Sequence, residues 1–256
     1  MARVIAVANQ KGGVGKTTTS VNLAASLVAL DKKILLIDLD PQGNATMGLG
    51  VEKNAVEQGL YDWLTDNAEF EAVVQHTESK VDLVPGNGEL TAAEVELMQL
   101  DARNVQLKNL LSRASKPYDI VIIDCPPTLN ILTVNALIAA QSLLIPVQCE
   151  YYALEGLSAL LQTIEQIRER ANPELKIEGL LRTMYDPRNG LTRDVSRQLL
   201  KFFGDQVFRT VIPRNVRLAE APSHGMPALL YDRSSRGAVA YLALAAELLS
   251  KINNRE

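Results

Sequence analysis

A glycine-rich stretch near the amino terminus carries residue types that bind phosphate. It reads Asn9-Gln-Lys-Gly-Gly-Val-Gly-Lys-Thr-Thr18. Glycines let backbone N–H groups approach phosphate oxygens without interference from a Cβ, and a helix N-terminus adds its positive dipole end. We expect Lys16 to reach the β- and γ-phosphates of a nucleotide and the Thr17 hydroxyl to bind Mg²⁺. The predicted nucleotide-binding residues of this loop are Gly12, Gly13, Val14, Gly15, Lys16, Thr17 and Thr18.

The same stretch departs from the general phosphate-loop pattern at its start. The pattern G-x-x-x-x-G-K-[ST] has glycine at position 10, where this chain has Gln10, and the next residue is a second lysine, Lys11. A solvated surface lysine is one explanation of Lys11. A role at a phosphate is the other.

Two apolar runs end in aspartate and offer carboxylates for a metal ion. They are Ile34-Leu-Leu-Ile-Asp38 and Ile120-Val-Ile-Ile-Asp124. The carboxyl ends of parallel strands meet at one sheet edge, which is where ligands bind in open α/β sheets. The pattern alone leaves both aspartates as candidates, and either could instead cap its strand end.

Short β-branched runs alternate with helical patterns along the chain. The runs that contain Ile34 and Ile120 are apolar on both alternating sets of positions, which is typical of strands covered on both faces. Strands are predicted at 4–8, 33–38, 81–84, 118–124, 142–148, 177–184 and 206–212. Helices are predicted at 16–30, 88–115, 132–140, 153–170, 191–203 and 234–253. We therefore predict an α/β fold with a single doubly wound, mostly parallel sheet and helices on both faces.

Length and composition fit one globular domain over residues 1–256. The chain is 47% hydrophobic and 22% charged, and no apolar run reaches the roughly 18 residues that a membrane-spanning helix needs. Its two cysteines, Cys125 and Cys149, are too few for a disulfide framework. A cytoplasmic location is expected.

Charge is distributed unevenly. The net charge of −4 divides into −7 over residues 1–150 and +3 over residues 151–256. Between residues 188 and 236 nine basic side chains stand against four acidic ones. A polyanion is therefore one candidate partner of this region.

The loop Lys11-Gly-Gly-Val-Gly-Lys-Thr17 resembles the deviant Walker A motif of the ParA/MinD family of ATPases, in particular the ParA/Soj partition proteins. The resemblance covers nearly the whole chain. Further matching segments are Asp38-Leu-Asp-Pro-Gln-Gly-Asn-Ala-Thr46, Asp124-Cys-Pro-Pro127, Pro146-Val-Gln-Cys-Glu-Tyr-Tyr-Ala-Leu-Glu-Gly156, Thr183-Met-Tyr-Asp186 and Ile212-Pro-Arg-Asn-Val-Arg-Leu-Ala-Glu-Ala-Pro222.

The resemblance implies a weak, partner-stimulated ATPase that uses ATP and Mg²⁺. Two subunits would sandwich the nucleotides, and Lys11 would cross to the phosphates of the other subunit. Asp124, at the start of switch II, would hold Mg²⁺ through water. Asp40, in switch I, would orient the attacking water, and a water-mediated contact between Asp40 and the metal ion is a further candidate. Lys11, Lys16, Asp40 and Asp124 are thus the predicted catalytic residues, and Asp38 is interpreted as structural.

The resemblance also places the adenine beside the segment 212–215. Pro213 would pack against the base and Asn215 would hydrogen-bond it, with Met184 or Tyr185 nearby. Pro213 could equally be a plain strand terminator.

A nonspecific DNA-binding surface is implied for the basic stretch 188–236. Because the first strand starts near residue 3, we expect no N-terminal helix-turn-helix, and site-specific recognition would come from a ParB-like centromere-binding protein that stimulates hydrolysis. The expected location is the cytoplasm, on the nucleoid, and the cargo could be a chromosome or a plasmid. The predicted DNA-binding residues are Arg193, Arg197, Lys201, Arg214, Arg217, Arg233 and Arg236.

Three other functions compete with this interpretation. A MinD-like membrane-cycling regulator needs a basic amphipathic C-terminal helix, whereas residues 248–256 turn polar, so we expect no membrane binding. An iron–sulfur protein of the same superfamily needs a C-x-x-C site, which Cys125 and Cys149 do not form. A DNA-binding scaffold that uses ATP only to hold its subunits together is the third.

Overall fold

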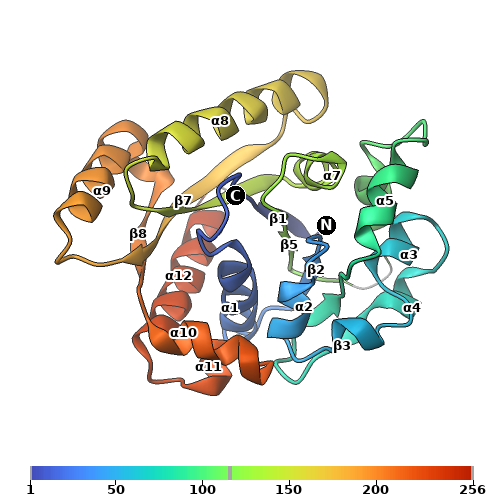
Figure 1. Ribbon diagram of the computed structural model, residues 1–256, viewed down its shortest axis with the longest axis horizontal. Helices are drawn as coiled ribbons and strands as arrows, with labels where there is room; N and C mark the ends of the chain where they lie inside the picture. The colour runs from blue at the N-terminus through green and yellow to red at the C-terminus, as the bar shows by residue number, and fades with distance from the viewer. Residues whose placement is uncertain (1, 115–116, 255–256) are drawn as a thin grey trace.

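The apolar strand runs lie side by side in one eight-stranded sheet (Figure 1). The structure is a computed structural model that describes residues 2–114 and 117–254. The strands are β1 (Arg3–Val7), β2 (Ile34–Asp38), β3 (Gln75–His76), β4 (Asp82–Val84), β5 (Ile120–Asp124), β6 (Ser142–Gln148), β7 (Lys176–Tyr185) and β8 (Val207–Pro213). Their order across the sheet is β3-β4-β2-β5-β1-β6-β7-β8. Every neighbouring pair is parallel except the antiparallel pair of β3 and β4.

The parallel register brings the carboxyl ends of the central strands together. Asp124 of β5 is the register partner of Val7 in β1 and of Asp38 in β2. The loop that follows β1 therefore begins beside both strand-end aspartates. This edge of the sheet is the position expected for a ligand site.

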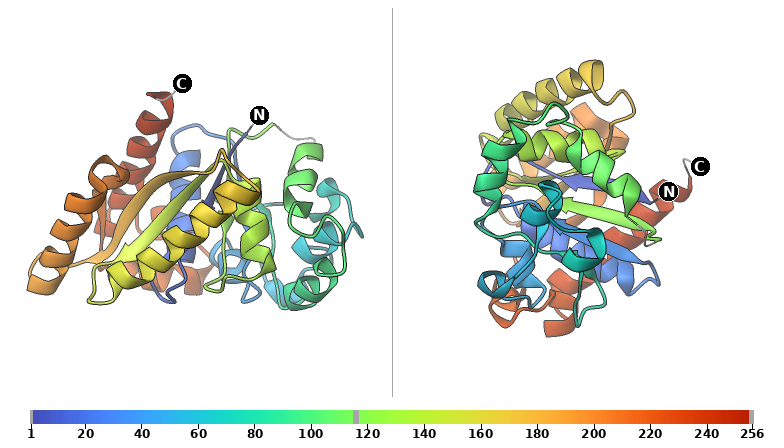
Figure 2. Two further views of the ribbon diagram at one scale, coloured as in Figure 1. Left: turned by 90° about the horizontal axis from the view of Figure 1, so that it is seen from above. Right: turned by 90° about the vertical axis from the view of Figure 1, so that its right-hand side faces the viewer.

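Helices cover both faces of the sheet, as Figure 2 shows from two further directions. They are α1 (Lys16–Val28), α2 (Asn44–Gly48), α3 (Leu60–Leu64), α4 (Phe70–Val73), α5 (Leu90–Leu97), α6 (Gln106–Arg113), α7 (Ile131–Ala139), α8 (Ala153–Arg170), α9 (Gly190–Phe203), α10 (Val216–Glu220), α11 (Ala228–Tyr231) and α12 (Arg236–Asn253). Short 3₁₀ turns span Lys53–Ala55, Gly204–Gln206 and Ala221–His224.

Alternation along each strand divides the core into two layers. Leu35 and Ile37 of β2 pack in the layer to which α3 and α5–α9 contribute, whereas Ile34 and Leu36 pack in the layer formed with α1 and α12. Because both faces are buried, the central strands are apolar between their end residues. The predicted doubly wound α/β class is confirmed.

One predicted helix, 88–115, is wrong as a single element. The chain instead forms α5 and α6, with residues 98–105 between them, and residue 115 lies outside the described residues. Asn135 of α7 stabilises the interruption because its side chain donates to the carbonyl of Arg103 at 2.7 Å and accepts from the N–H of Leu107 at 3.2 Å. A tertiary contact therefore replaces the missing helical bonds.

The other predicted elements are present, and residues 142–148 and 153–170 coincide with β6 and α8. The last helix begins two residues later than predicted because Ser235 caps it, accepting from the N–H of Ala238 at 3.2 Å. Elements absent from the prediction are β3, α2, α3, α4, α10 and α11.

Candidate active site

The phosphate loop lies at the carboxyl edge of the sheet, between the end of β1 and Lys16, the first residue of α1. Gly13 and Gly15 have φ of 73° and 88°, a backbone region that favours glycine. A Cβ on Gly12 or Gly13 would meet no atom within 4 Å. The loop is therefore an open cradle at a helix N-terminus, and this geometry fits phosphate.

Lys16 lies inside this cradle. Its side chain is buried, and its Nζ lies 3.3 Å from the carbonyl oxygen of Lys11. Burial lowers the pKa of Lys16, while the nearby carboxyls of Asp124 and Asp40 act in the opposite direction. An added phosphate would favour the charged ammonium in the same way.

Asp124 has one carboxylate oxygen engaged and one open. It is fully buried, and its Oδ1 accepts from the Ser20 hydroxyl at 2.7 Å. Its Oδ2 has no hydrogen-bond partner within the described parts of the chain. Burial raises the pKa of Asp124 to about 6, against the hydroxyls of Ser20 and Thr17. A carboxylate oxygen and a hydroxyl beside a phosphate cradle fit Mg²⁺, which Thr17 and Asp124 would hold.

Asp38, in contrast, has both oxygens occupied. Its Oδ2 accepts from the N–H and the hydroxyl of Thr46, both at 2.7 Å, and its Oδ1 accepts from the N–H of Asp40 at 3.3 Å. Burial and the neighbouring Asp124 raise the pKa of Asp38 to about 8. These bonds support the structural interpretation of Asp38, which fixes the loop leading to α2.

Asp40 extends from this loop toward the same site. Its side chain is nearly buried, and its Oδ1 accepts from the N–H of Gln42 at 2.9 Å. It lies close enough to Lys16 and Asp124 to influence the pKa of both. The structure thus gathers three of the four predicted catalytic residues around the cradle, and their roles stay predictions.

The two raised carboxyl pKa values predict that acid stabilises the nucleotide-free protein. In the folded protein, Asp38 and Asp124 bind protons as the pH falls below about 8 and about 6. In the unfolded chain, the same carboxyls stay ionised until the pH falls to about 4. The free energy of unfolding should therefore rise as pH falls from about 8 to about 5, by at most about 1.4 kcal/mol per pH unit for each bound proton. Thermal unfolding in EDTA across this range measures the effect. Asp124→Asn should flatten the curve below about pH 6, and an unchanged curve would contradict the assignment.

A cavity of about 200 Å³ lies between the phosphate loop and the ends of β7 and β8. The Oδ1 of Asn215 is buried without a hydrogen-bond partner in the described residues, as expected of an acceptor that awaits a ligand. Met184 has φ of 47°, which is strained for a non-glycine residue. The lining of the cavity includes Gly15, Thr18, Thr183, Met184, Pro213 and Asn215 but not Tyr185. Of the two residues predicted to lie beside an adenine, only Met184 lines this cavity, so the geometry favours Met184.

Removing the Asn215 side chain should weaken adenine nucleotide binding. We expect Asn215→Ala to raise the Kd for ATP about tenfold, because a hydrogen bond in a buried site is worth roughly 1.4 kcal/mol. Discrimination against GTP should fall in parallel, since a carbonyl acceptor disfavours the O6 of guanine. Equilibrium titration with fluorescent ATP and GTP measures both constants. Asn67→Ala, at an exposed asparagine, is the control, and equal Kd values for the two variants would refute the contact.

Lys11 occupies a different environment from Lys16. Its Nζ lies 2.7 Å from Oε2 of Glu150, and the two side chains are 34% and 48% exposed. Such an exposed ion pair is worth at most about 1 kcal/mol. The ammonium is therefore held at the surface and can be released at little cost.

The seven predicted DNA-binding residues are all exposed but differ in their ion pairs. Arg197 pairs with Asp194 at 3.1 Å, and Arg217 pairs with Glu220 at 2.7 Å and with Asp232 at 3.3 Å. Across residues 2–114 and 117–254, no carboxylate lies within 4.0 Å of a nitrogen of Arg193, Lys201, Arg214, Arg233 or Arg236. Their charges remain available to a polyanion.

The cysteines are packing residues in this structure. Cys125 and Cys149 are buried, and burial raises the pKa of both thiols, that of Cys149 to about 11. No group of three or more His, Cys, Asp or Glu side chains suited to a metal ion occurs in the described part of the chain. The iron–sulfur alternative gains no support.

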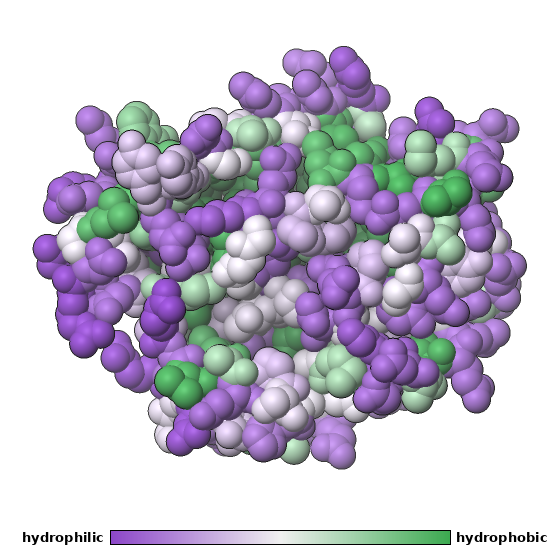
Figure 3. All heavy atoms as spheres, viewed as in Figure 1, coloured by the Kyte–Doolittle hydropathy of each residue, from purple (hydrophilic) through white to green (hydrophobic). Residues whose placement is uncertain are grey.

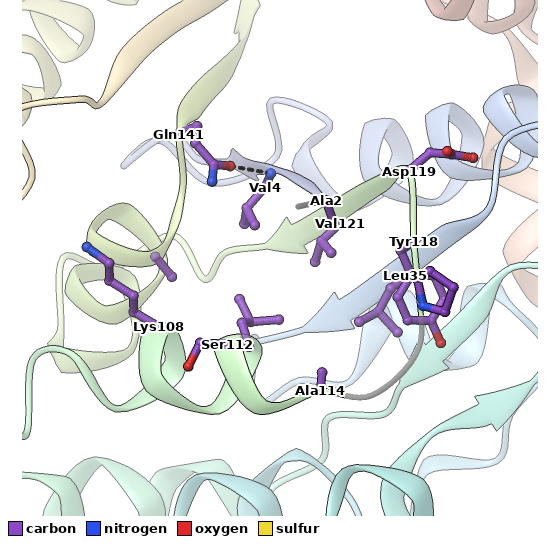
Figure 4. A pocket seen from close by; sticks show the side chains of 13 residues that line it. Ala2, Val4, Leu35, Lys108, Ser112, Ala114, Tyr118, Asp119, Val121 and Gln141 are labelled. Carbon is purple, nitrogen blue, oxygen red and sulfur yellow. Dashed lines mark hydrogen bonds between the residues drawn. The ribbon is translucent and has the colours of Figure 1, made fainter.

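A larger cavity, of about 580 Å³, lies away from this site (Figure 4). Its lining includes Val4, Leu35, Val121 and Gln141, and the Gln141 side chain accepts from the N–H of Val4 at 2.5 Å. Val4, Leu35 and Val121 lie on β1, β2 and β5, away from the strand ends that carry Asp38 and Asp124. Size therefore does not identify the nucleotide site.

Three polar side chains of the site were not predicted. Asn9 donates to the carbonyl of Pro146 at 2.7 Å, and Thr183 donates to the carbonyl of Val14 at 2.7 Å, so both tie the loop to neighbouring strands. Ser20 holds Asp124. A polar residue at the end of an apolar strand is the only sequence signal for Thr183.

Comparison with known proteins gives a consistent family. A family model described as "AAA domain" matches residues 2–177. The chain is 54% identical over 249 residues to the sporulation initiation inhibitor protein Soj of Bacillus subtilis, covering 97% of this chain and 98% of Soj. It is 44% identical to the chromosome-partitioning ATPase Soj of Treponema pallidum, with all of both chains covered. It is 48% identical to the chromosome partitioning protein ParA of Myxococcus xanthus, covering 98% and 89%.

Solved structures agree with the fold. Cobyrinic acid a,c-diamide synthase of Mycobacterium smegmatis, with bound ATP analogue and magnesium, superposes with a TM-score of 0.88 at 36% identity, covering 100% of this chain and 98% of that one. MinD of Pyrococcus horikoshii, complexed with Mg-ADP, gives a TM-score of 0.78 at 26% identity, covering 97% and 96%. The chain belongs to the ParA/Soj family of chromosome-partitioning P-loop ATPases.

Proposed function

We propose that this chain is an ATP-driven switch in chromosome segregation. ATP and Mg²⁺ are its nucleotide and metal ion, and an ATP-bound sandwich dimer binds DNA nonspecifically until a ParB-like partner stimulates hydrolysis and releases it. The protein works in the cytoplasm on the nucleoid. Family membership supports the segregation role, and the residues of the site support the nucleotide cycle.

The unequal placement of the two loop lysines is the observation that most supports the proposed dimer. Lys16 is buried within its own cradle, whereas the Lys11 ammonium lies at the surface beside Glu150. A cation at the rim of a phosphate site can complete the corresponding site of a second copy, and a twofold dimer then completes both sites at once. Only a nucleotide with a γ-phosphate places negative charge near enough to the Lys11 ammonium of the second copy to attract it. The dimer would therefore respond to ATP rather than ADP.

Hydrolysis requires charge neutralisation and an oriented water. Thr17 and the open oxygen of Asp124 would hold Mg²⁺, which would neutralise phosphate charge when bound. Lys16 and the loop N–H groups stabilise charge that develops on the phosphates. Asp40, restrained by the N–H of Gln42, accepts a hydrogen bond from the attacking water and orients it. A partner that improves this orientation would raise the rate.

The basic side chains without carboxylate partners are the best DNA contacts. The double variant Arg233→Ala/Arg236→Ala should bind nonspecific DNA more weakly, with the slope of log K against log salt reduced by about 0.9 for each lost phosphate contact. Arg197→Ala/Arg217→Ala should change the slope less, because both arginines already pair with carboxylates. Fluorescence anisotropy with ATP at several salt concentrations compares the two. Equal slopes in both variants would show that the ion pairs do not matter.

Membrane cycling of the MinD type is the second candidate, since MinD shares the fold. The apolar face of α12 lies in the core, where Tyr241, Leu244 and Leu248 are buried. On the face that Figure 3 shows, hydrophobic areas are separated by hydrophilic side chains. No described helix is long and apolar enough to span a membrane. Sedimentation with anionic liposomes and ATP should leave the protein in the supernatant, and co-sedimentation would favour this candidate.

The deciding experiment is the ATPase rate with and without ParB and DNA. We expect a slow basal rate that rises when both are present. A rate unaffected by either would favour a scaffold that uses ATP only to join its subunits.

A further inference from the structure

After its first residue, Lys16, helix α1 carries four consecutive hydroxyl side chains, Thr17-Thr-Thr-Ser20. Thr17 is the predicted metal ligand, Thr18 lines the cavity of about 200 Å³ beside the phosphate loop, and the Thr19 hydroxyl lies 3.1 Å from that of Tyr241. Ser20 is fully buried, one helical turn beyond Lys16. The fourth hydroxyl is therefore shielded from solvent, and its hydrogen-bond partners are protein groups.

Two acceptors compete for the single hydroxyl proton of Ser20. The carbonyl oxygen of Lys16 lies at 3.1 Å, which is the usual partner of a serine within a helix. Asp124 Oδ1 lies closer, at 2.7 Å, and carries charge when ionised. Charge-assisted bonds are shorter and stronger than neutral ones, so the proton is given to Asp124.

This bond restricts how the Asp124 carboxylate can turn. The backbone beside it is already fixed, because the N–H of Cys125 donates to the carbonyl of Val7 at 3.2 Å. Only the side-chain torsions of Asp124 remain, and a donor on Oδ1 limits them. Oδ2 is then left buried and without a partner in the described residues, beside the start of α1.

We propose that Ser20 is a positioning residue for the metal site. By holding Oδ1 of Asp124, it presents Oδ2 to Mg²⁺ or to a water bound to the metal ion. The proposal rests on the metal role proposed above for Asp124. Groups that orient metal-linked carboxylates typically contribute about tenfold to a hundredfold in metal affinity.

The same helix offers a matched control. Ser26 is also a fully buried serine of α1, but its hydroxyl has no hydrogen-bond partner in the described residues. Ser26→Ala makes the same chemical change at the same depth without touching Asp124. Any general effect of deleting a buried hydroxyl from α1 appears in both variants.

The experiment is a Mg²⁺ titration of the ADP complex, followed by the fluorescence of a labelled ADP. Ser20→Ala should need about tenfold or more Mg²⁺ for half-saturation. Its ADP affinity in EDTA should match that of the unmodified protein, which also shows that the variant is folded. Ser26→Ala should match the unmodified protein in both measurements. Mn²⁺ in place of Mg²⁺ lets electron paramagnetic resonance report metal binding independently.

Asp124→Asn separates the possible failures. If Asp124→Asn weakens Mg²⁺ binding and Ser20→Ala does not, the positioning role is overturned. If neither variant weakens it, the metal role of Asp124 is overturned as well. Should Ser20→Ala fail to fold, Ser20→Cys, with a weaker donor of similar size, must show an intermediate Mg²⁺ requirement, and an unchanged requirement overturns the proposal.

Discussion

Replacing Asp40 with alanine should leave ATP binding and ATP-dependent dimerisation intact while lowering the ATPase rate at least about a hundredfold. Orienting and activating a water contributes roughly 10²-fold to 10⁴-fold in enzymes. The proposed phosphate contacts come from Lys16 and the loop rather than from the Asp40 side chain. Single-turnover hydrolysis with ParB and DNA measures the chemical step, and analytical ultracentrifugation measures the dimer.

The control for this variant is Asp101→Ala, which removes an exposed aspartate remote in sequence from the loop. It should keep the full rate. An Asp40→Ala protein that hydrolyses ATP normally would contradict the water-orienting role. One that no longer binds ATP would show that Asp40 acts on the fold of the site instead.

Replacing Lys11 with alanine should abolish ATP-dependent dimerisation, and with it partner-stimulated hydrolysis and stable DNA binding. The monomer should still bind ATP with nearly unchanged affinity, because Lys16 and the cradle remain. DNA affinity should fall because a dimer presents two basic surfaces where a monomer presents one. Ultracentrifugation with ATP, followed by DNA binding, measures both effects.

Glu150→Ala distinguishes the dimer role from the ion pair seen within one chain. It removes the partner of Lys11 at 2.7 Å but leaves the lysine free to cross. We expect this variant to dimerise with ATP. If Glu150→Ala and Lys11→Ala lose the dimer equally, the ion pair within the chain is what matters, and the crossing role is wrong.

Burial on both faces made the central sheet predictable. The runs at Ile34 and Ile120 lie in the middle of the sheet, where continuous apolarity has a direct cause. The strand β3 could not be found in this way, because two antiparallel edge residues show no periodicity. The interruption between α5 and α6 was missed because it depends on Asn135, whose partners lie 28 and 32 positions away in the chain.

The site was predictable to the extent that its chemistry lies in one continuous stretch. Gly13, Gly15 and Lys16 have a spacing that only a phosphate loop explains well. The choice between Asp38 and Asp124 came from family resemblance, and the structure adds a physical reason in the bonds that occupy Asp38. The roles of Ser20 and Thr183 were not predicted, because their hydrogen bonds join residues 104 and 169 positions apart in the chain.

The most direct test of the shared site mixes two inactive proteins, Lys11→Ala and Asp40→Ala. If Lys11 acts on the nucleotide of the other subunit, a mixed dimer has one complete site, formed by Asp40 of one chain and Lys11 of the other. Mixed dimers should then restore part of the normal ATPase rate with ParB and DNA, at most about one half, because one of the two sites in each mixed dimer is complete. A mixture no more active than its two components would contradict the account.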